Sequence, residues 1–276
     1  MDDMVDSTML SIKDFSEFSG VSQTTLRYYD EIGVLPPAMR GKNNYRYYTP
    51  MQIIILNFIN VLIDLGVPLA KIKDVSEHRT PQIMVELLGT QEDILDARLH
   101  ELRTAYSILH TYRKSIQTGL LADENFIGVK EMNEVKLVEG PQNDFRDSES
   151  FYLAFIAFCN SAEKHRINLR YPIGGVHDSM EGFLQAPSEP HRFYSLDPCG
   201  NTTRPGGKYL VGYHRGYYGQ FGDLPEKFDK YAKDNGLIYT GPVYSHYLLD
   251  EVSVANPHNY LSRVIVRLKA SGQDNG

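Results

Sequence analysis

The sequence predicts a multidomain chain that is α-helical in its first two parts and α+β in its third. Three observations support this prediction. Short helical patterns and turn residues alternate in the first part, leucines recur at helical spacing in the second, and a βαββ pattern occurs twice in the third. A length of 276 residues suits more than one domain, and an apolar fraction of 42% is ordinary for chains that bury a core. We place the domains at residues 9–76, 80–119 and 125–270.

The first predicted domain begins with two short helices. Apolar residues at helical spacing between residues 12 and 18 are followed by Gly20, which ends the first helix. Ser22 is the expected N-cap of the second helix, and Gly33 ends it. Two helices joined by a tight turn that contains glycine form a helix-turn-helix pattern.

A hairpin and two further helices complete this domain. Turn-forming residues at 41–44 precede a strand of tyrosine and arginine, which is typical of a β-hairpin, or wing. Pro50 and Pro68 each stand at the start of a helical pattern, where proline is well tolerated. The sequence therefore predicts a winged helix-turn-helix domain.

The second part predicts a short helix followed by a long coiled-coil helix. The short helix begins at Thr80–Pro81 and ends at Gly89, and Thr90 caps a new helix that reaches about Gly119. Apolar residues recur along this long helix at heptad spacing. We expect them to form the dimerisation seam, at Leu95, Leu99, Leu102, Tyr106, Leu109 and Ile116. The alternative is that the helix packs on its own chain, but so narrow a seam favours a partner helix and a homodimer.

The third part predicts an α+β domain with a duplicated βαββ pattern. The first copy comprises strand residues 126–140, helix 148–167, and strands 171–185 and 191–197. The second copy comprises strand 207–216, helix 221–236, and strands 239–250 and 260–269. The repetition is one of pattern rather than of amino acids, and it predicts internal pseudo-symmetry.

The first domain carries the features of a DNA-binding surface. The net charge of −7 argues against indiscriminate nucleic-acid binding, but no Asp or Glu occurs between Ile32 and Ile63. Short polar side chains at the start of the second helix can reach phosphates and base edges in a major groove. The candidate DNA-binding residues are Ser22, Thr24, Thr25, Arg27, Tyr28, Tyr29, Arg40, Lys42, Tyr45, Arg46 and Tyr48. Some of these tyrosines could instead belong to the core, and this alternative stays open for Tyr29 and for Tyr47.

Four motifs in the same order carry a resemblance to a known family. They are Thr25-Leu26-Arg27-Tyr28-Tyr29, Gly33-Val34-Leu35, Tyr45-Arg46-Tyr47-Tyr48 and Leu65-Gly66-Val67-Pro68-Leu69. Together they resemble the N-terminal winged-helix domain of the MerR family of transcription regulators. The third domain is similar, at residues 214–218 and 244–249, to the gyrase-inhibitor-like (GyrI-like) effector-binding domain of the multidrug-sensing branch.

This resemblance implies an activator that works by distorting DNA. The dimer would bind double-stranded promoter DNA in which an overlong spacer separates the elements read by the RNA polymerase holoenzyme. Ligand-bound protein would bend and undertwist that spacer. The protein would thus recognise the deformability of the DNA as well as its base edges. The resemblance also implies a small hydrophobic or cationic, drug-like effector.

Aromatic residues crowd the third domain and suggest where such an effector would bind. Aromatic faces attract cations, and ligand sites are apolar cavities with a few polar groups. The candidate ligand-binding residues are Glu181, Phe183, Tyr194, Tyr213, Tyr217, Tyr218, Tyr244 and Tyr247. Any one of these aromatics could instead be sheet core. Drug-binding relatives usually carry a buried glutamate on the last strand, where this chain has Arg263. Either another acid replaces it, with Glu181 favoured over Glu251, or the ligand is not a simple cation.

Several other classes of protein are disfavoured. The two cysteines, Cys159 and Cys199, form no metal-binding motif, and no cysteine occurs in residues 76–90 or 119–126, where metal-sensing relatives place theirs. We therefore expect no metal, no cofactor and no catalytic residues. No apolar run approaches the roughly 18 residues that cross a membrane, and the acidic start does not suit a secretory signal. A cytoplasmic, nucleoid-associated bacterial protein is expected, and the alternatives for the third domain are a small-molecule hydrolase and a protein-interaction module.

Overall fold

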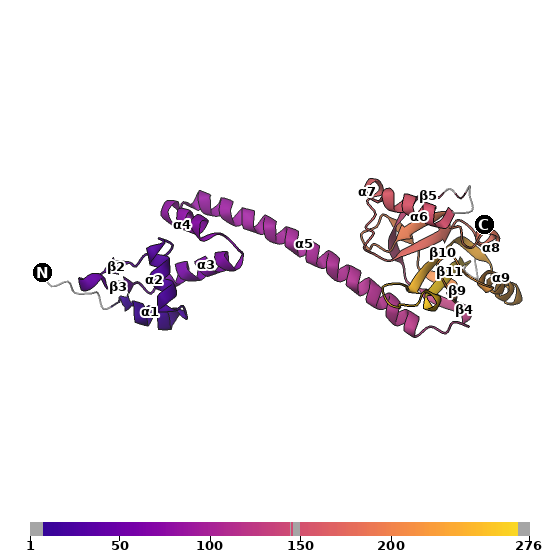
Figure 1. Cartoon of the computed structure of the whole chain (residues 1–276), viewed down its shortest axis with the longest axis horizontal. Coiled ribbons are helices and arrows are strands. Elements are labelled where there is room, and N and C mark those ends of the chain that lie inside the picture. The colour runs from indigo at the N-terminus through magenta and orange to yellow at the C-terminus, as the bar shows by residue number, and fades with distance from the viewer. Residues whose placement is uncertain (1–7, 144, 146–149, 270–276) are drawn as a thin grey trace, which may run out of the picture. The chain divides into compact units, whose positions relative to one another are not determined.

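The computed structural model describes residues 8–143, 145 and 150–269 (Figure 1). The predicted end of the third domain at residue 270 and the acidic start of the chain lie outside these residues. The chain divides into two compact units, residues 1–100 and 101–276, and each is described by itself. Within the described residues, no helix combines the length and the apolar character needed to cross a lipid bilayer.

The N-terminal unit contains small helices and a three-stranded antiparallel sheet. Its helices are α1 (Ile12–Ser19), α2 (Gln23–Glu31), α3 (Gln52–Asp64), α4 (Leu69–His78) and the first part of α5 (Pro81–Leu120). Its strands are β1 (Leu10–Ser11), β2 (Met39–Arg40) and β3 (Arg46–Tyr48), in the order β1-β3-β2. A short 3-10 turn, Lys42–Asn44, joins β2 to β3. This arrangement is the predicted winged helix-turn-helix.

Local sequence determines where α1 and α2 begin and end. The Ser22 hydroxyl accepts a hydrogen bond from the Thr25 backbone amide, so Ser22 is the N-cap of α2 as predicted. Gly20 adopts a φ of 74° after α1, a left-handed conformation that favours glycine. The apolar faces of both helices then meet in a core with Phe15, Leu26 and Leu56 at its centre.

The long helix corrects the sequence prediction at Gly89. Residues 81–120 form one uninterrupted helix, α5, rather than a short helix and a long one. The Thr90 hydroxyl does not cap a new start, because it donates a hydrogen bond to the carbonyl oxygen of Glu86 one turn earlier. A single glycine lowers the stability of a helix by about 1 kcal/mol relative to alanine, which is too little to end one that packs at both ends.

Gly89→Ala is therefore expected to stabilise the N-terminal unit by about 0.5–1 kcal/mol. A methyl group at this position would meet no atom within 4 Å, so the gain in helix propensity is not offset by a clash. Chemical unfolding followed by circular dichroism measures the change. A decrease in stability would mean that Gly89 marks a helix boundary after all.

The C-terminal unit is built on an eight-stranded antiparallel sheet. In chain order the strands are β4 (Ile127–Met132), β5 (Val135–Gln142), β6 (Ile173–His177), β7 (Arg192–Ser195), β8 (Thr202–Arg204), β9 (Gly207–Arg215), β10 (Tyr239–Leu249) and β11 (Leu261–Leu268). The helices are the end of α5, α6 (Ser150–Asn160), α7 (Ala162–His165), α8 (Met180–Gln185) and α9 (Leu224–Asp234), and a 3-10 turn, Pro257–Asn259, precedes β11. The strand order is β4-β9-β11-β10-β6-β7-β5-β8.

This strand order confirms the predicted duplication. The first copy is β5-α6-β6-β7 and the second is β9-α9-β10-β11, and their middle strands, β6 and β10, pair at the centre of the sheet. Each copy is also preceded by a short strand that pairs with the other copy, since β4 pairs with β9 and β8 pairs with β5. The two copies are thus related by a pseudo-two-fold axis and exchange their first strands.

Two parts of the sheet differ from the sequence prediction. The run 171–185 is not one strand, because β6 ends at His177 and α8 follows, with the Ser179 hydroxyl accepting from the Gly182 amide as N-cap. The run 126–140 is likewise two strands, β4 and β5. Alternating apolar residues continue across both breaks, so periodicity alone does not reveal the turns.

The sheet has a different core on each face. Helices α8 and α9 pack on one face against Leu210, Val243 and Val264. The other face contains Val211, Tyr244 and Ile265, and Ile116 of α5 packs against it. Because side chains alternate along a strand, neighbouring residues of β10 and β11 serve opposite faces.

Candidate nucleic-acid interface and ligand cavity

The second helix presents a polar face to solvent. Thr24 and Arg27 are exposed, and Tyr28 is 48% exposed, whereas Tyr29 is only 8% exposed. Neighbours on a helix point about 100° apart, so the two tyrosines cannot share a face. The structure therefore places Tyr29 in the core, so the prediction that it contacts DNA is wrong, whereas Thr24, Arg27 and Tyr28 remain available to DNA.

Two other predicted contacts at the start of α2 already serve the helix itself. The Ser22 and Thr25 hydroxyls are 2.8 Å apart, and Ser22 also accepts from the Thr25 amide at 3.1 Å. A hydroxyl has more than one hydrogen-bonding site, so both can still reach a phosphate. Their first role in this structure is to cap α2.

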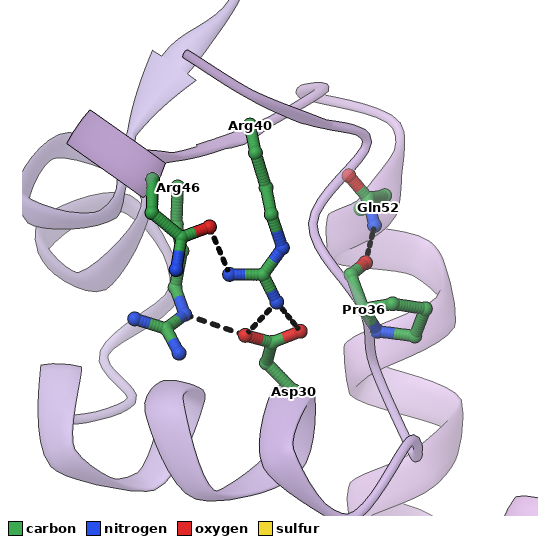
Figure 2. A network of polar contacts seen from close by, with 6 residues as sticks. Asp30, Pro36, Arg40, Arg46 and Gln52 are labelled. Atoms are coloured by element: carbon green, nitrogen blue, oxygen red, sulfur yellow. Dashed lines mark hydrogen bonds and ion pairs between the residues drawn. The ribbon is translucent and has the colours of Figure 1, made fainter. Parts of the chain in front are cut away.

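A buried carboxylate fixes the wing to α2 (Figure 2). The Arg40 guanidinium donates to both carboxylate oxygens of Asp30, at 2.7 and 2.6 Å, and the Arg46 Nε donates to the same group at 2.6 Å. The Asp30 side chain is almost fully buried, and the Asn44 side chain accepts from Arg40 at 3.1 Å. These contacts join both strands of the wing to the end of α2.

The same carboxylate changes the role of two predicted DNA contacts. Arg40 and Arg46 were expected to give the wing a local positive charge, yet each is paired with Asp30. Lys42 and Tyr45 are exposed on the connection between the strands and remain available. Tyr48 is fully buried and stacks on Phe15 with ring centroids 4.7 Å apart, so it belongs to the core rather than to the surface.

The predicted seam on α5 is an exposed apolar stripe over most of its length. Leu99, Leu102, Tyr106 and Leu109 are exposed in the single chain, and Leu95 is half-buried. Ile116 differs, because it packs against the sheet of its own C-terminal unit. These four large apolar side chains lie along one side of the helix, and they are removed from water only if another surface covers them.

A cavity of about 450 Å³ lies in the C-terminal unit, within the usual range for small-molecule sites. Three of the predicted residues, Tyr217, Tyr218 and Tyr247, line it. Tyr218 and Tyr247 are in contact, with ring centroids 4.5 Å apart at 67°. The other aromatic residues of the wall are Tyr112, Phe151, Tyr152, Phe155, Tyr171, Phe193 and Phe221.

Acidic groups gather at one end of this aromatic cavity. Asp250 and Glu251 both line it, and the Tyr218 hydroxyl donates to the Glu251 carboxylate. Within the described part of the chain, neither carboxylate is paired with a Lys, Arg or His side chain. Burial raises the pKa of the Asp250 carboxyl, and burial together with the Glu251 carboxylate raises the pKa of the Tyr218 hydroxyl. The cavity therefore offers negative charge and aromatic faces without a cation of its own.

Hydrogen bonds hold the aromatic wall in place. The Tyr247 hydroxyl donates to the Tyr217 carbonyl oxygen at 3.1 Å and accepts from the Gly219 amide at 3.0 Å. The Tyr152 and Tyr217 hydroxyls are joined by a 2.9 Å hydrogen bond. These bonds connect α6, the loop after β9, and β10.

The remaining predicted ligand residues lie elsewhere. Phe183 is a fully buried residue of α8 and packs in the core between α8, α9 and the sheet. Tyr194, Tyr213 and Tyr244 belong to the core on the face that packs against α5. Glu181 is exposed in the first turn of α8, where its carboxylate accepts from the Gln185 side chain. Glu181 was assigned to a strand, and the helix turns it away from the cavity. Glu251, the other candidate, does line the cavity, together with Asp250.

Sequence reasoning missed Tyr112 and the aromatic residues of α6. Tyr112 lies on the predicted dimerisation helix but outside its seam, and the α6 residues lie in a predicted helix of the third domain. The consecutive glycines of β6 reflect close packing on both faces of the sheet, because a side chain at either position would clash with a neighbour. A side chain at Gly175 would meet Pro190 at 2.8 Å, and one at Gly174 would meet Tyr194 at 2.4 Å. Both glycines line the cavity.

The described residues contain no group of three His, Cys, Asp or Glu side chains arranged to hold a metal ion. Cys159 is half-buried and Cys199 is exposed, and both are free thiols.

Comparison with known proteins gives matches to one domain and to nearly the whole chain. Residues 10–78 match the MerR HTH family regulatory proteins. The multidrug-efflux transporter 2 regulator of Bacillus subtilis (strain 168) is 26% identical over 262 residues, covering 93% of this chain and 95% of the relative. The multidrug-efflux transporter 1 regulator of the same strain is 24% identical over 274 residues, covering 94% and 97%. Among solved structures, EcmrR in a DNA complex within EcmrR-RPo covers 95% of this chain and 100% of its own, with a TM-score of 0.38 and 16% identity.

Proposed function

Because this chain is a transcription regulator of the MerR family, related to regulators of multidrug-efflux transporters, we propose that it activates a promoter when a drug-like cation occupies its aromatic cavity. The observation that carries the proposal is the pair of carboxylates, Asp250 and Glu251, facing a wall of aromatic rings. A cation with aromatic or apolar substituents satisfies both. Cation–π contacts contribute about 0.5–2 kcal/mol each, and ionic contacts add to them where water is excluded.

Promoter recognition is assigned to α2 and the wing. Thr24, Arg27 and Tyr28 form the exposed face of α2, which suits entry into a major groove. Lys42 and Tyr45 at the tip of the wing suit phosphate contact. The Asp30 ion pairs hold the wing in one orientation relative to α2, so both elements meet the duplex together.

Dimerisation is assigned to the exposed stripe of α5. Pairing Leu99, Leu102, Tyr106 and Leu109 with the same residues of a second chain would remove four large apolar side chains from water. A symmetric dimer presents two copies of α2 to two half-sites. In this proposal the bound dimer bends or untwists the DNA between the half-sites, and a smooth bend costs roughly 1–6 kcal/mol.

The ligand acts by favouring the conformation that distorts DNA. A ligand can shift an equilibrium only by its differential affinity for the two conformations. We therefore expect ligand binding and promoter distortion to be coupled reciprocally. Distorted DNA should raise the affinity for the ligand by the same factor by which the ligand raises the affinity for distorted DNA. The ligand itself leaves the cavity chemically unchanged.

Run-off transcription with RNA polymerase holoenzyme tests this function. The template pair would carry the same promoter with an overlong spacer and with a spacer of ordinary length. The ligand set would be tetraphenylphosphonium, the similarly shaped tetraphenylborate anion, and the neutral triphenylphosphine oxide. We expect only the cation to raise transcription, and only from the overlong spacer. Equal activation by all three compounds, or activation by none, would overturn the proposal.

Arg27→Ala is expected to weaken binding to a selected operator by about 1–3 kcal/mol and to make the salt dependence of the affinity shallower by about one phosphate contact. Arg27 is exposed and, among the residues that the structure describes, its side chain hydrogen-bonds only to the neutral Gln23 side chain, so its charge is available to DNA. Fluorescence anisotropy over a range of salt concentrations measures both quantities. Lys230→Ala, which removes an exposed charge from α9, is the control and should change neither; an unchanged affinity for Arg27→Ala would remove Arg27 from the interface.

A further inference from the structure

A second cavity lies on the opposite face of the sheet from the aromatic one. Its volume is about 510 Å³, and it is lined by the end of α5, the turn between β4 and β5, and strands β10 and β11. Alternation along β10 separates the two spaces, because Tyr247 lines the aromatic cavity and His246 lines this one. The two cavities therefore have different walls, and a ligand in one does not touch the walls of the other.

Two arginines give this second cavity its character. Arg204 is only 5% exposed, and its guanidinium lies over the Tyr209 ring at 5.0 Å from the centroid. One terminal nitrogen, Nη2, donates to the Asn133 carbonyl oxygen at 3.1 Å, while the other, Nη1, is buried and has no hydrogen-bond partner. Arg263 repeats this arrangement: its Nη2 contacts the His246 Nε2 at 3.3 Å, and its Nε is buried without a partner.

Neither arginine has a counter-ion among the described residues. Across the part of the chain that the structure describes, no carboxylate forms an ion pair with Arg204 or Arg263. Lys114 and Lys136 also line the cavity, against Glu131 and Glu134, so four cationic side chains face two acidic ones. Buried donors are nearly always satisfied and buried charges nearly always paired, so this arrangement is incomplete without an anion.

The histidine beside Arg263 supports the same conclusion. His246 is 4% exposed, and its pKa is lowered well below the ordinary value by burial first and then by the charges of Arg263 and Arg204. The neutral ring accepts from Arg263 and adds no charge of its own. Its position orients one edge of the guanidinium and leaves the Nε edge free.

We propose that this second cavity binds a small organic anion, with a carboxylate or phosphate group held between Arg204 and Arg263. Guanidinium groups bind both kinds of oxyanion through paired N–H donors. Leu137, Leu248 and Ile265 supply an apolar wall for the organic part of the ligand. The C-terminal unit would then hold two ligands of opposite charge on the two faces of one sheet.

Isothermal titration of the full-length protein at constant ionic strength tests this proposal. The probes are benzoate, phenyl phosphate and the neutral benzamide, which separate carboxylate, phosphate and uncharged versions of one ring. We expect at least one anion to bind at least tenfold more tightly than benzamide. The anion that binds more tightly indicates whether the natural ligand carries a carboxylate or a phosphate group.

Matched variants connect the binding to the arginines. Arg263→Gln is expected to lose at least tenfold in affinity for the anion. Arg267→Gln, which removes the same charge from the same strand outside the cavity, should retain it. Tetraphenylphosphonium affinity should be unchanged in Arg263→Gln, which shows that the variant is folded and separates this proposal from the one for the aromatic cavity.

Three results would overturn the proposal. The first is that neither anion binds more tightly than benzamide. The second is that Arg263→Gln and Arg267→Gln lose affinity equally, which would indicate general surface charge. The third is that Arg263→Gln binds the anion as tightly as the unaltered protein while it remains folded.

Discussion

Asp30→Asn is expected to lower the free energy of unfolding of the N-terminal unit by about 3 kcal/mol. The substitution removes the charge that pairs both Arg40 and Arg46 while leaving the shape of the side chain almost unchanged. Removing one partner of a buried ion pair typically costs about 3–5 kcal/mol, because the remaining charge is left uncompensated. We expect the lower end of this range, since the Arg40 side chain is partly exposed and can turn toward water.

The loss should be concentrated in the wing. Hydrogen exchange read by mass spectrometry is expected to show faster exchange in β2 and β3, with no change in the C-terminal sheet. Operator affinity should fall by more than affinity for random DNA, because the freed arginines still attract phosphates but no longer orient the wing. Asp74→Asn, which removes an exposed acid of α4 paired with His78, is the control and should cost less than about 1 kcal/mol. Equal losses in the two variants would contradict the role assigned to Asp30.

Glu251→Gln is expected to weaken the binding of tetraphenylphosphonium by about 1.5–3 kcal/mol and to abolish its effect on transcription. Glutamine keeps the size of the side chain and can still accept from the Tyr218 hydroxyl, so the variant removes charge with little change of shape. Thermal-shift titration measures the affinity, and run-off transcription measures the response.

Glu181→Gln is the matched control for this experiment. The sequence favoured Glu181 as the acid of the cavity, but the structure places it on the exposed surface of α8. We expect unchanged cation affinity in this variant. A loss in Glu181→Gln, together with full affinity in Glu251→Gln, would reverse the assignment.

The affinity for a cation should also fall with acidification. Burial raises the pKa of Asp250, so its carboxyl takes up a proton at a higher pH than an ordinary aspartate does. Lowering the pH neutralises the Asp250 carboxylate, and the loss of this negative charge weakens cation binding. Because the folded state holds this proton more tightly than the unfolded chain does, the stability that Asp250 contributes is present at low pH and is lost as pH rises through its folded pKa. Asp250→Asn should bind the cation more weakly near neutral pH and show a flatter pH profile.

The helix-turn-helix and the duplicated sheet could be predicted from sequence because their determinants are local. The cap at Ser22, the left-handed turn at Gly20 and the alternating strands each depend on residues close in the chain. The interruption at Gly89 was wrong for the same reason. Local propensity disfavours glycine in a helix, but whether α5 continues through Gly89 is determined by packing at both ends of the helix.

The candidate sites could be predicted only in part because they depend on contacts between distant residues. The absence of acidic residues between Ile32 and Ile63 predicted a positively charged wing, yet Asp30, just outside that segment, pairs with both Arg40 and Arg46. The aromatic cavity is lined by residues of α5, α6 and β10 together, and only Tyr217, Tyr218 and Tyr247 of its aromatic wall were predicted from the sequence. One wrong secondary-structure prediction, a strand where the structure has helix α8, was enough to place Glu181 in the interior rather than on the surface.

The exchanged first strands have a consequence for how the C-terminal unit is made. β4 leaves the ribosome first, but its partner β9 follows only after β5 to β8 have been synthesised. Contacts so distant in sequence form slowly, and an unpaired strand is open to association with other chains in the meantime. Neither copy of the repeat can complete its sheet alone, so a chain truncated between β7 and β8 should remain unfolded rather than yield half a domain.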